Sequence, residues 1–226
     1  MWDPTNGHVG GPTVNSELKL IDIPEMDYLT TDTDENGKLQ PRGEILARGY
    51  TNIPAYYKME EKSKETIDKD GWIHTGDVGM ILPNNVLKII DRKKNLFKLS
   101  IGEYIAPEKI ENVYVKVPYI AEVFIHGDSL KRYIVGVFVP DPIPFEQLAK
   151  KHNIGGDIEE LCENKKLMDI VYDDLIKEGK QSDLLGFEQV RSFVMFPESL
   201  GTEKNGSLLT DTMKLKRHYA KVFLKK

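Results

Sequence analysis

The sequence has 226 residues, of which 40% are hydrophobic, and a formal net charge of −5. This length and composition fit one or two packed domains. The negative charge argues against a nucleic-acid-binding protein, because phosphate binding requires a basic face. The single cysteine, Cys162, excludes an internal disulfide and a cysteine zinc cluster and fits a reducing, intracellular compartment. No apolar run approaches about 18 residues, so we expect no transmembrane segment in this chain.

Short β-like runs alternate with turn clusters over the first 93 residues. We expect strands at 18–23, 43–48, 72–82 and 86–90. The acidic turn at 32–37 looks superficially like a calcium loop, but it lacks the glutamate at the twelfth loop position, so we expect no metal there. Within 52–69 the charges alternate in sign, which is typical of a solvated surface helix.

After residue 94 the pattern changes to helices around a few strands. Pro107 begins an amphipathic helix that ends before Pro118. We then expect strands at 121–126 and 132–139 joined by a hairpin turn at 127–130, helices at 144–152, 158–162 and 166–177, a strand at 189–196 and a loop at 201–207. This order predicts an α+β fold, with a small sheet flanked by helices.

A last helix is predicted from Met213 to the end of the chain. Its expected apolar face consists of Leu215, Tyr219, Val222 and Phe223. The same segment is basic and could lie on a membrane surface. Docking on its own domain is the favoured interpretation.

The segment from Gly71 to Glu111 carries the clearest candidate site. Asp77 lies in a glycine turn, and its carboxylate could accept two hydroxyl hydrogen bonds, as a ribose diol requires. Arg92 follows an apolar run, and its guanidinium could reach an oxygen-rich ligand. His74, three residues before Asp77, could line the same site or serve in packing. The alternative is that Asp77 caps a turn and 91–94 is a solvated loop.

Five motifs occur in a fixed order along the chain. They are Gly43-Glu44-Ile45-Leu46-Ala47-Arg48-Gly49, Gly71-Trp72-Ile73-His74-Thr75-Gly76-Asp77, Asp91-Arg92-Lys93-Lys94, Gly102-Glu103-Tyr104-Ile105 and the terminal Leu209 to Arg217. In this order they resemble the carboxyl-terminal part of the adenylate-forming enzymes, most closely the long-chain fatty acyl-CoA synthetases. Five ordered motifs are far more specific than any one of them.

The resemblance implies a ligase that works in two steps. A fatty acid first attacks the α-phosphate of ATP to give an acyl-adenylate, and the thiol of coenzyme A then displaces AMP. Lys214 matches the family's catalytic lysine, whose ammonium stabilises charge on the α-phosphate. Asp77 and Arg92 match the residues that hold the ribose hydroxyls.

The resemblance also implies a moving domain. Residues 1–93 would be the carboxyl-terminal portion of the large adenylating domain, and 94–226 the small mobile domain with the catalytic lysine. Lys94 matches the hinge between the two steps. Gly102 and Glu103 fall in the loop that turns toward coenzyme A for thioester formation.

The chain departs from the family pattern in what it lacks. It contains neither the family's Ser/Thr/Gly-rich phosphate loop nor a Gly-x-x-x-x-Gly-Lys-Ser/Thr substitute. We therefore expect the chain to begin part-way along the enzyme, with Met1 either a start introduced by cloning or the natural residue at that position. We expect the magnesium site and the acyl tunnel in an upstream part, so that this fragment alone is inactive.

Two alternatives stay open at this point. One is another adenylate-forming enzyme, luciferase-like or amino-acid-activating, although Thr212-Met213-Lys214 looks like the long-chain branch. The other is a non-catalytic binding module of the same fold, and the presence of Asp77, Arg92 and Lys214 counts against it. We expect the full protein in the cytoplasm or at the cytoplasmic face of a membrane, with peripheral association open.

Overall fold

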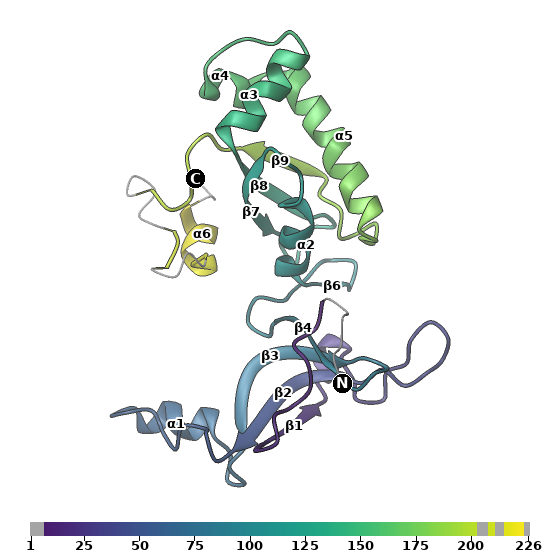
Figure 1. Ribbon diagram of the computed structural model, residues 1–226, viewed down its shortest axis with the longest axis vertical. Helices are drawn as coiled ribbons and strands as arrows, with labels where there is room; N and C mark the ends of the chain where they lie inside the picture. The colour runs from purple at the N-terminus through teal and green to yellow at the C-terminus, as the bar shows by residue number, and fades with distance from the viewer. Residues whose placement is uncertain (1–6, 203–207, 211–214, 224–226) are drawn as a thin grey trace. The chain divides into compact units, whose positions relative to one another are not determined.

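The computed structural model describes residues 7–202, 208–210 and 215–223, without the side chains of His218 and Phe223 (Figure 1). The chain folds as two compact units, Met1–Leu96 and Phe97–Lys226. Each unit combines helices with small sheets, which confirms the predicted α+β class. The predicted division at 93/94 lies three residues from this one. Its assignment to a large and a small mobile domain stays a prediction.

The first unit is built on one four-stranded antiparallel sheet. Its strands β1 (Ser16–Ile21), β2 (Arg42–Gly49), β3 (Ile73–Ile81) and β4 (Leu87–Arg92) pair in chain order. All four predicted strands are present, with shifted ends. A 3-10 turn, Pro24–Met26, follows β1.

Helix α1 (Glu60–Thr66) is shorter than the predicted run at 52–69 and buries no residue. An ion pair between Lys64 and Glu60, with Nζ and Oε1 2.8 Å apart, lies on its surface. The prediction of a solvated surface helix is therefore correct in kind and too long in extent.

The acidic turn is held by its own backbone and one arginine. Asp32 pairs with Arg42 at 2.7 Å. Asp34 accepts hydrogen bonds from the backbone N–H groups of Asn36 and Lys38, both at 2.9 Å. These carboxylates act as turn-stabilising acceptors.

Two sheets lie within the described residues of the second unit. The strands β5 (Phe97–Lys98) and β6 (Tyr104–Ile105) form a short antiparallel pair. The larger sheet has the order β7 (Ile120–His126), β8 (Val135–Pro140) and β9 (Ser192–Met195). The β7/β8 pair is antiparallel and the β8/β9 pair is parallel.

Helices α3 (Pro142–Lys151), α4 (Ile158–Glu163) and α5 (Lys165–Gln181) make the crossover that a parallel strand pair requires. Helix α2 (Pro107–Tyr114) begins with the predicted proline and packs against β7 and α5 (Figure 1). Asp157 begins α4 with a capping box, and Asn164 caps α5 through the N–H of Leu167.

Within its described residues, the second unit has two clusters of buried apolar side chains, and the larger one contains Phe138. Phe138 is fully buried and makes edge-to-face contacts with Tyr114 and Phe193, with ring centroids 5.6 and 5.7 Å apart. The hydroxyl of Tyr114 accepts a hydrogen bond from the N–H of Val190 at 3.1 Å. Side chains from α2, α5 and the sheet thus form one cluster.

The end of the chain differs from the prediction. Helix α6 spans Arg217–Phe223, and Leu215 instead pairs with Leu209 in an isolated antiparallel bridge. Tyr219 and Val222 are 66% and 58% exposed, whereas Ala220 is buried. The predicted apolar face is therefore wrong for Tyr219 and Val222, whereas Leu215 packs on the buried cluster that contains Ala220. The side chain of Phe223 lies outside the described residues. Met213 and most of the predicted loop at 201–207 lie outside the described residues.

Candidate nucleotide-binding site

Asp77 and Arg92 lie opposite each other on adjacent strands. They are register partners in the β3/β4 pair, and Nε of Arg92 lies 2.9 Å from Oδ1 of Asp77. Their side chains are 24% and 51% exposed, so the pair is open to solvent. The structure therefore brings these two predicted site residues together as an ion pair that a ligand can reach.

The backbone around Asp77 is fixed by a glycine turn and a threonine. Gly76 has a φ of +70°, a conformation that glycine adopts without steric cost. The hydroxyl of Thr75 donates to the carbonyl of Ile45 at 2.8 Å and accepts from the N–H of Asp77 at 3.0 Å. The N–H of Lys93 donates to the carbonyl of Gly76 at 2.8 Å. Both strands are thus tied together at the ion pair.

A buried carboxylate lies beside this pair, on β2. Glu44 is 6% exposed. Its Oε2 lies 3.3 Å from Nζ of Lys93, and its Oε1 lies 3.4 Å from Nδ1 of His74. Sequence analysis did not single out Glu44, although an acid beside the apolar run Ile45-Leu46-Ala47 is an unusual placement for a β-strand residue.

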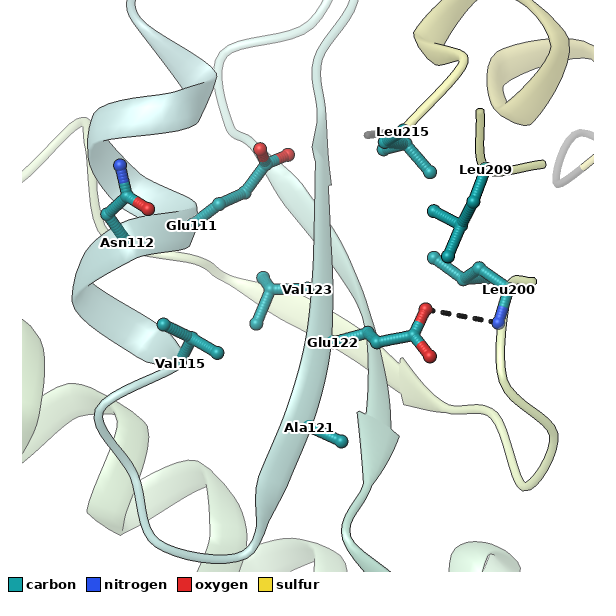
Figure 2. Close-up of a pocket in the computed structure, with 9 residues that line it drawn as sticks. All are labelled: Glu111, Asn112, Val115, Ala121, Glu122, Val123, Leu200, Leu209 and Leu215. Atoms are coloured by element: carbon teal, nitrogen blue, oxygen red, sulfur yellow. Dashed lines mark hydrogen bonds between the residues drawn. The ribbon is translucent and has the colours of Figure 1, made fainter. Parts of the chain in front are cut away.

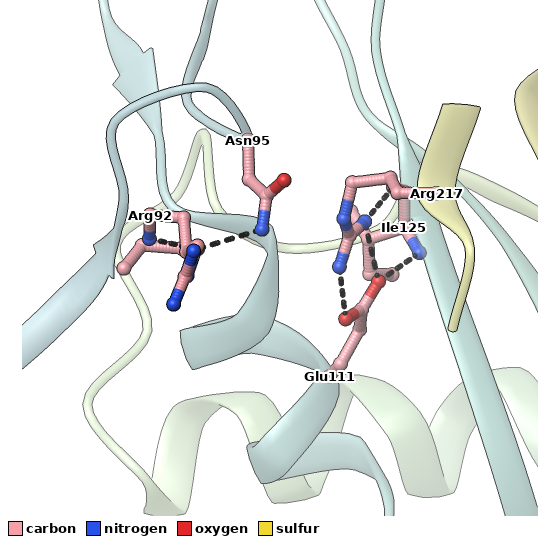
Figure 3. Close-up of polar contacts among 6 residues, drawn as sticks. Arg92, Asn95, Glu111, Ile125 and Arg217 are labelled. Atoms are coloured by element: carbon pink, nitrogen blue, oxygen red, sulfur yellow. Dashed lines mark hydrogen bonds and ion pairs between the residues drawn. The ribbon is translucent and has the colours of Figure 1, made fainter. Parts of the chain in front are cut away.

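Asp91 organises the turn that follows β4. It is 1% exposed, and its Oδ1 accepts from the N–H of Arg92 at 2.6 Å and from Nδ2 of Asn95 at 3.4 Å (Figure 3). Lys94 is exposed within this turn. The predicted hinge residue thus lies between a buried anchor and the boundary of the two units at 96/97.

Gly102 and Glu103 form the exposed turn that joins β5 to β6. Gly102 has a φ of +94°, and its N–H donates to the carbonyl of Leu99 at 3.0 Å. The N–H of Leu99 donates to the carbonyl of Glu103 at 2.9 Å. The loop is a tight turn with its backbone at the surface, and its approach to coenzyme A stays a prediction.

Lys214, the predicted catalytic residue, lies outside the described residues. The chain on either side of it is described. Leu209 pairs with Leu215, and the N–H of Lys216 donates to the carbonyl of Leu208 at 2.7 Å. These bonds tie the chain before Lys214 to the chain after it.

Arg217 attaches the terminal segment, residues 215–223, to α2 through Glu111 and to β7 through Ile125. Its two terminal nitrogens lie 2.9 and 2.6 Å from the two carboxylate oxygens of Glu111 (Figure 3). The N–H of Ile125 also donates to Glu111 at 2.7 Å. The pair is largely buried, with side chains 18% and 14% exposed. Sequence analysis missed it, because 106 residues separate the partners.

Burial raises the pKa of the Glu111 carboxyl above its ordinary value of 4.5. The hydrogen bonds and charge of Arg217 and the N–H of Ile125 act in the opposite direction and only partly offset the loss of hydration. The ion pair is therefore one in which desolvation outweighs attraction.

A cavity of about 280 Å³ lies beside this attachment (Figure 2). Its walls come from α2, β7 and the chain that follows β9, and are formed by Glu111, Asn112, Val115, Ala121, Glu122, Val123, Leu200, Leu209 and Leu215. Glu122 accepts a hydrogen bond from the N–H of Leu200 at 3.1 Å and so ties the chain that follows β9 to β7. The cavity therefore lies between the surface of α2 and β7 and the later chain that packs on it at Leu200, Leu209 and Leu215.

The described ranges 7–202, 208–210 and 215–223 contain neither a metal-ligand cluster nor a membrane-spanning helix. No group of three His, Cys, Asp or Glu side chains in these ranges could hold a metal ion. The helices described there are all too short or too polar to cross a bilayer.

Comparison with known proteins places this geometry in context. No protein-family model matches the chain. The long-chain-fatty-acid–CoA ligase 6 of Rattus norvegicus is 44% identical over 224 residues, which are 99% of this chain and 31% of that ligase. The chain resembles the long-chain fatty acid–CoA ligases over almost its whole length. It spans about a third of the length of that relative.

Solved structures support the same assignment. The adenylation domain of a carboxylate reductase from Mycobacterium chelonae superimposes with a TM-score of 0.75 at 33% identity, over 92% of this chain and 30% of that one. The corresponding domain from Segniliparus rugosus, solved with AMP and a carboxylic acid, gives 0.74 at 32% identity, over 91% of this chain and 29% of that one. The chain is therefore similar in fold to part of these adenylation domains and similar in sequence to part of the long-chain fatty acid–CoA ligases.

Proposed function

We propose that this chain is the carboxyl-terminal part of an ATP-dependent long-chain fatty acid–CoA ligase. The observation that carries the proposal is the Asp77–Arg92 pair, placed side by side on β3 and β4 in a chain that resembles such ligases throughout. Since the chain spans about a third of its relative, we assign the activity to the longer protein and expect this fragment alone to be inactive.

Asp77 and Arg92 are the proposed ribose clamp. A carboxylate accepts hydrogen bonds from two vicinal hydroxyls, and the guanidinium offers further donors in a planar fork. When the nucleotide binds, the hydroxyls take the place of the direct ion pair. The adenylation domain from Segniliparus rugosus, to which this chain is similar, was solved with AMP.

The remaining predicted residues divide between the two steps. Lys214 stabilises negative charge on the α-phosphate while the acyl-adenylate forms. Rotation at Lys94 then brings the loop of Gly102 and Glu103 to the coenzyme A thiol, whose sulfur attacks the acyl carbon as AMP leaves. The magnesium site is proposed to lie in an upstream part of the longer protein; among the described residues of this chain, no group of three His, Cys, Asp or Glu side chains could hold a metal ion.

The location of the longer protein is also proposed. The single buried cysteine, Cys162, fits a reducing cytoplasm. Peripheral association with the cytoplasmic face of a membrane would give access to fatty acids. The exposed Tyr219 and Val222 on the basic terminal helix are the residues to test for it.

The proposal is tested by separating the two half-reactions in the complete reading frame. Lys214→Ala should slow acyl-adenylate formation by roughly 10²–10³-fold, as for loss of a preorganised transition-state donor. It should leave thioester formation from presynthesised adenylate largely intact. Lys94→Pro should do the reverse, because proline restricts the backbone rotation.

Glu17→Gln is the matched control, since Glu17 forms an exposed ion pair with Arg48 at the far edge of the same sheet. If both Lys214→Ala and Lys94→Pro slowed the two half-reactions equally, the assigned roles would be wrong. If the complete protein formed no adenylate from long-chain fatty acids, the ligase assignment itself would fail.

A further inference from the structure

One buried side chain contacts a sequence neighbour of each residue of the proposed ribose clamp. Glu44 on β2 contacts His74, which precedes Asp77 by three residues on β3. It also contacts Lys93, the residue that directly follows Arg92 at the end of β4. A single carboxylate thus bridges the neighbours of the two clamp residues without contacting either of them in the described hydrogen bonds and ion pairs.

The strand pairing is irregular where this bridge lies. The β2/β3 register shifts between Glu44 and Leu46, and the β3/β4 register shifts between Val78 and Gly79. Such shifts interrupt the ladder of backbone hydrogen bonds and re-aim side chains. Next to the clamp, therefore, side-chain contacts must supply part of the alignment that regular pairing supplies elsewhere.

A carboxylate is a costly group for a purely structural bridge. Burying a carboxylate loses hydration free energy, which close ionic partners must offset. A neutral group of the same size avoids that loss. Glu44 is only 8% exposed at its side chain, and its two partners lie at 3.3 and 3.4 Å rather than in tight contact. Lys93 has a second, more exposed acidic neighbour in Glu25, at 3.7 Å.

We propose that Glu44 is a positioning residue for the nucleotide: its buried charge holds Lys93 and His74 so that Asp77 and Arg92 face the ribose hydroxyls together. This proposal rests on the proposed function, because it assumes that the pair binds ribose. Glu44 acts through its neighbours, so its removal weakens ribose recognition and leaves the chemical step intact.

The experiment compares ATP with 2′-deoxy-ATP in the complete enzyme. Glu44→Gln keeps the size of the side chain and removes its charge. Loss of one charge-assisted contact corresponds to about a three- to tenfold rise in KM for ATP, with kcat within about twofold. KM for 2′-deoxy-ATP should rise by a smaller factor than KM for ATP, because one of the two hydroxyls that the clamp recognises is already missing.

Two further variants make the outcome decisive. Asp77→Asn should abolish most of the preference for ATP over 2′-deoxy-ATP, and Glu17→Gln should leave that preference unchanged. Should Glu44→Gln fold poorly in thermal unfolding, Lys93→Met removes the other side of the bridge at a residue 37% exposed, with the same expected loss of preference.

The possible results distinguish a failure of the positioning role of Glu44 from a failure of the ribose clamp. If Asp77→Asn loses the preference while Glu44→Gln and Lys93→Met keep it, the positioning role is overturned and the clamp stands. If Asp77→Asn also keeps the preference, the clamp itself is wrong. If Glu44→Gln lowers kcat and stability with an unchanged preference, Glu44 has a structural role only.

Discussion

The two units of this chain use their interiors differently. Buried hydrophobic side chains are few in the first unit: Ile23, Tyr28, Ile45, Leu46, Val78, Leu87 and Leu96. The first unit also buries two acids, Glu44 and Asp91, next to the proposed clamp. The second unit packs α2, α5 and its sheet around a large apolar cluster centred on Phe138. The second unit also buries Glu188 and most of Glu111, and pairs each with a cation, Lys109 and Arg217, beside a much larger apolar core. Buried charge is therefore prominent in the small interior of the first unit, whereas apolar packing dominates the second.

The largest expected effect lies in the apolar core of the second unit. Phe138→Ala removes a fully buried ring and should lower the free energy of unfolding by about 3–5 kcal/mol. Far-UV circular dichroism follows the helices of the second unit, and tryptophan fluorescence follows the first, since Trp2 and Trp72 both belong to it. In urea unfolding, Phe138→Ala should lower the midpoint of the circular-dichroism transition and leave the midpoint of the fluorescence transition unchanged. An equal shift of both signals would show that the units unfold together.

The next effect concerns the attachment of the terminal segment. Arg217→Met leaves the Glu111 carboxylate largely buried and without its cation, which should cost about 2–3 kcal/mol at neutral pH. The double variant with Glu111→Gln removes the stranded charge and should recover part of that loss. Urea unfolding of both variants measures the coupling, and purely additive losses would argue against the ion pair.

The same carboxyl should give a pH dependence of modest size. Its pKa is raised on folding, so between 4.5 and that raised value the folded chain holds a proton that the unfolded chain has released. The contribution of Glu111 to the free energy of unfolding therefore falls as pH rises through this window, by at most about 1.4 kcal/mol per pH unit. Glu111→Gln should remove this slope in urea titrations at several pH values. A slope of opposite sign in the difference between the two proteins would contradict the shift.

The smallest effect is expected at the edge of the first unit's sheet. Glu17 and Arg48 lie 2.5 Å apart with side chains 61% and 41% exposed. Glu17→Gln should change the free energy of unfolding by no more than about 0.2–1 kcal/mol, because solvent screens such pairs. Tryptophan fluorescence during urea unfolding measures this change. A loss as large as that of Arg217→Met would show that the exposed pair contributes as much to stability as the buried pair.

The sequence was sufficient where short-range patterns decide structure. Alternating runs located β2, β3 and β4, and Pro107 located the start of α2. The same local rules failed near the chain's end, where the Leu209–Leu215 bridge replaces a helical turn. That bridge depends on packing against the second unit, which helical periodicity alone does not reveal.

The candidate site shows the same limit. Motif order pointed to Asp77 and Arg92, and their strand pairing then follows from two neighbouring strands. Glu44 and the Arg217–Glu111 pair were not predicted, because each depends on contacts between residues far apart in sequence: 49 positions separate Glu44 from Lys93. Burial of charge is a property of the folded chain, and no local pattern encodes it.

The topology of the sheets has a consequence for the order of folding. In the first unit each strand pairs with the next along the chain, and the longest connection, residues 50–72, is less than half as long as the 141–191 connection between β8 and β9. In the second unit β9 pairs with β8 only after α3, α4 and α5 have spanned the intervening residues. Closing that long loop loses chain entropy before any contact offsets it. The first unit should therefore form its sheet quickly despite its small core, and the docking of β9 should be the slow kinetic step of the larger unit.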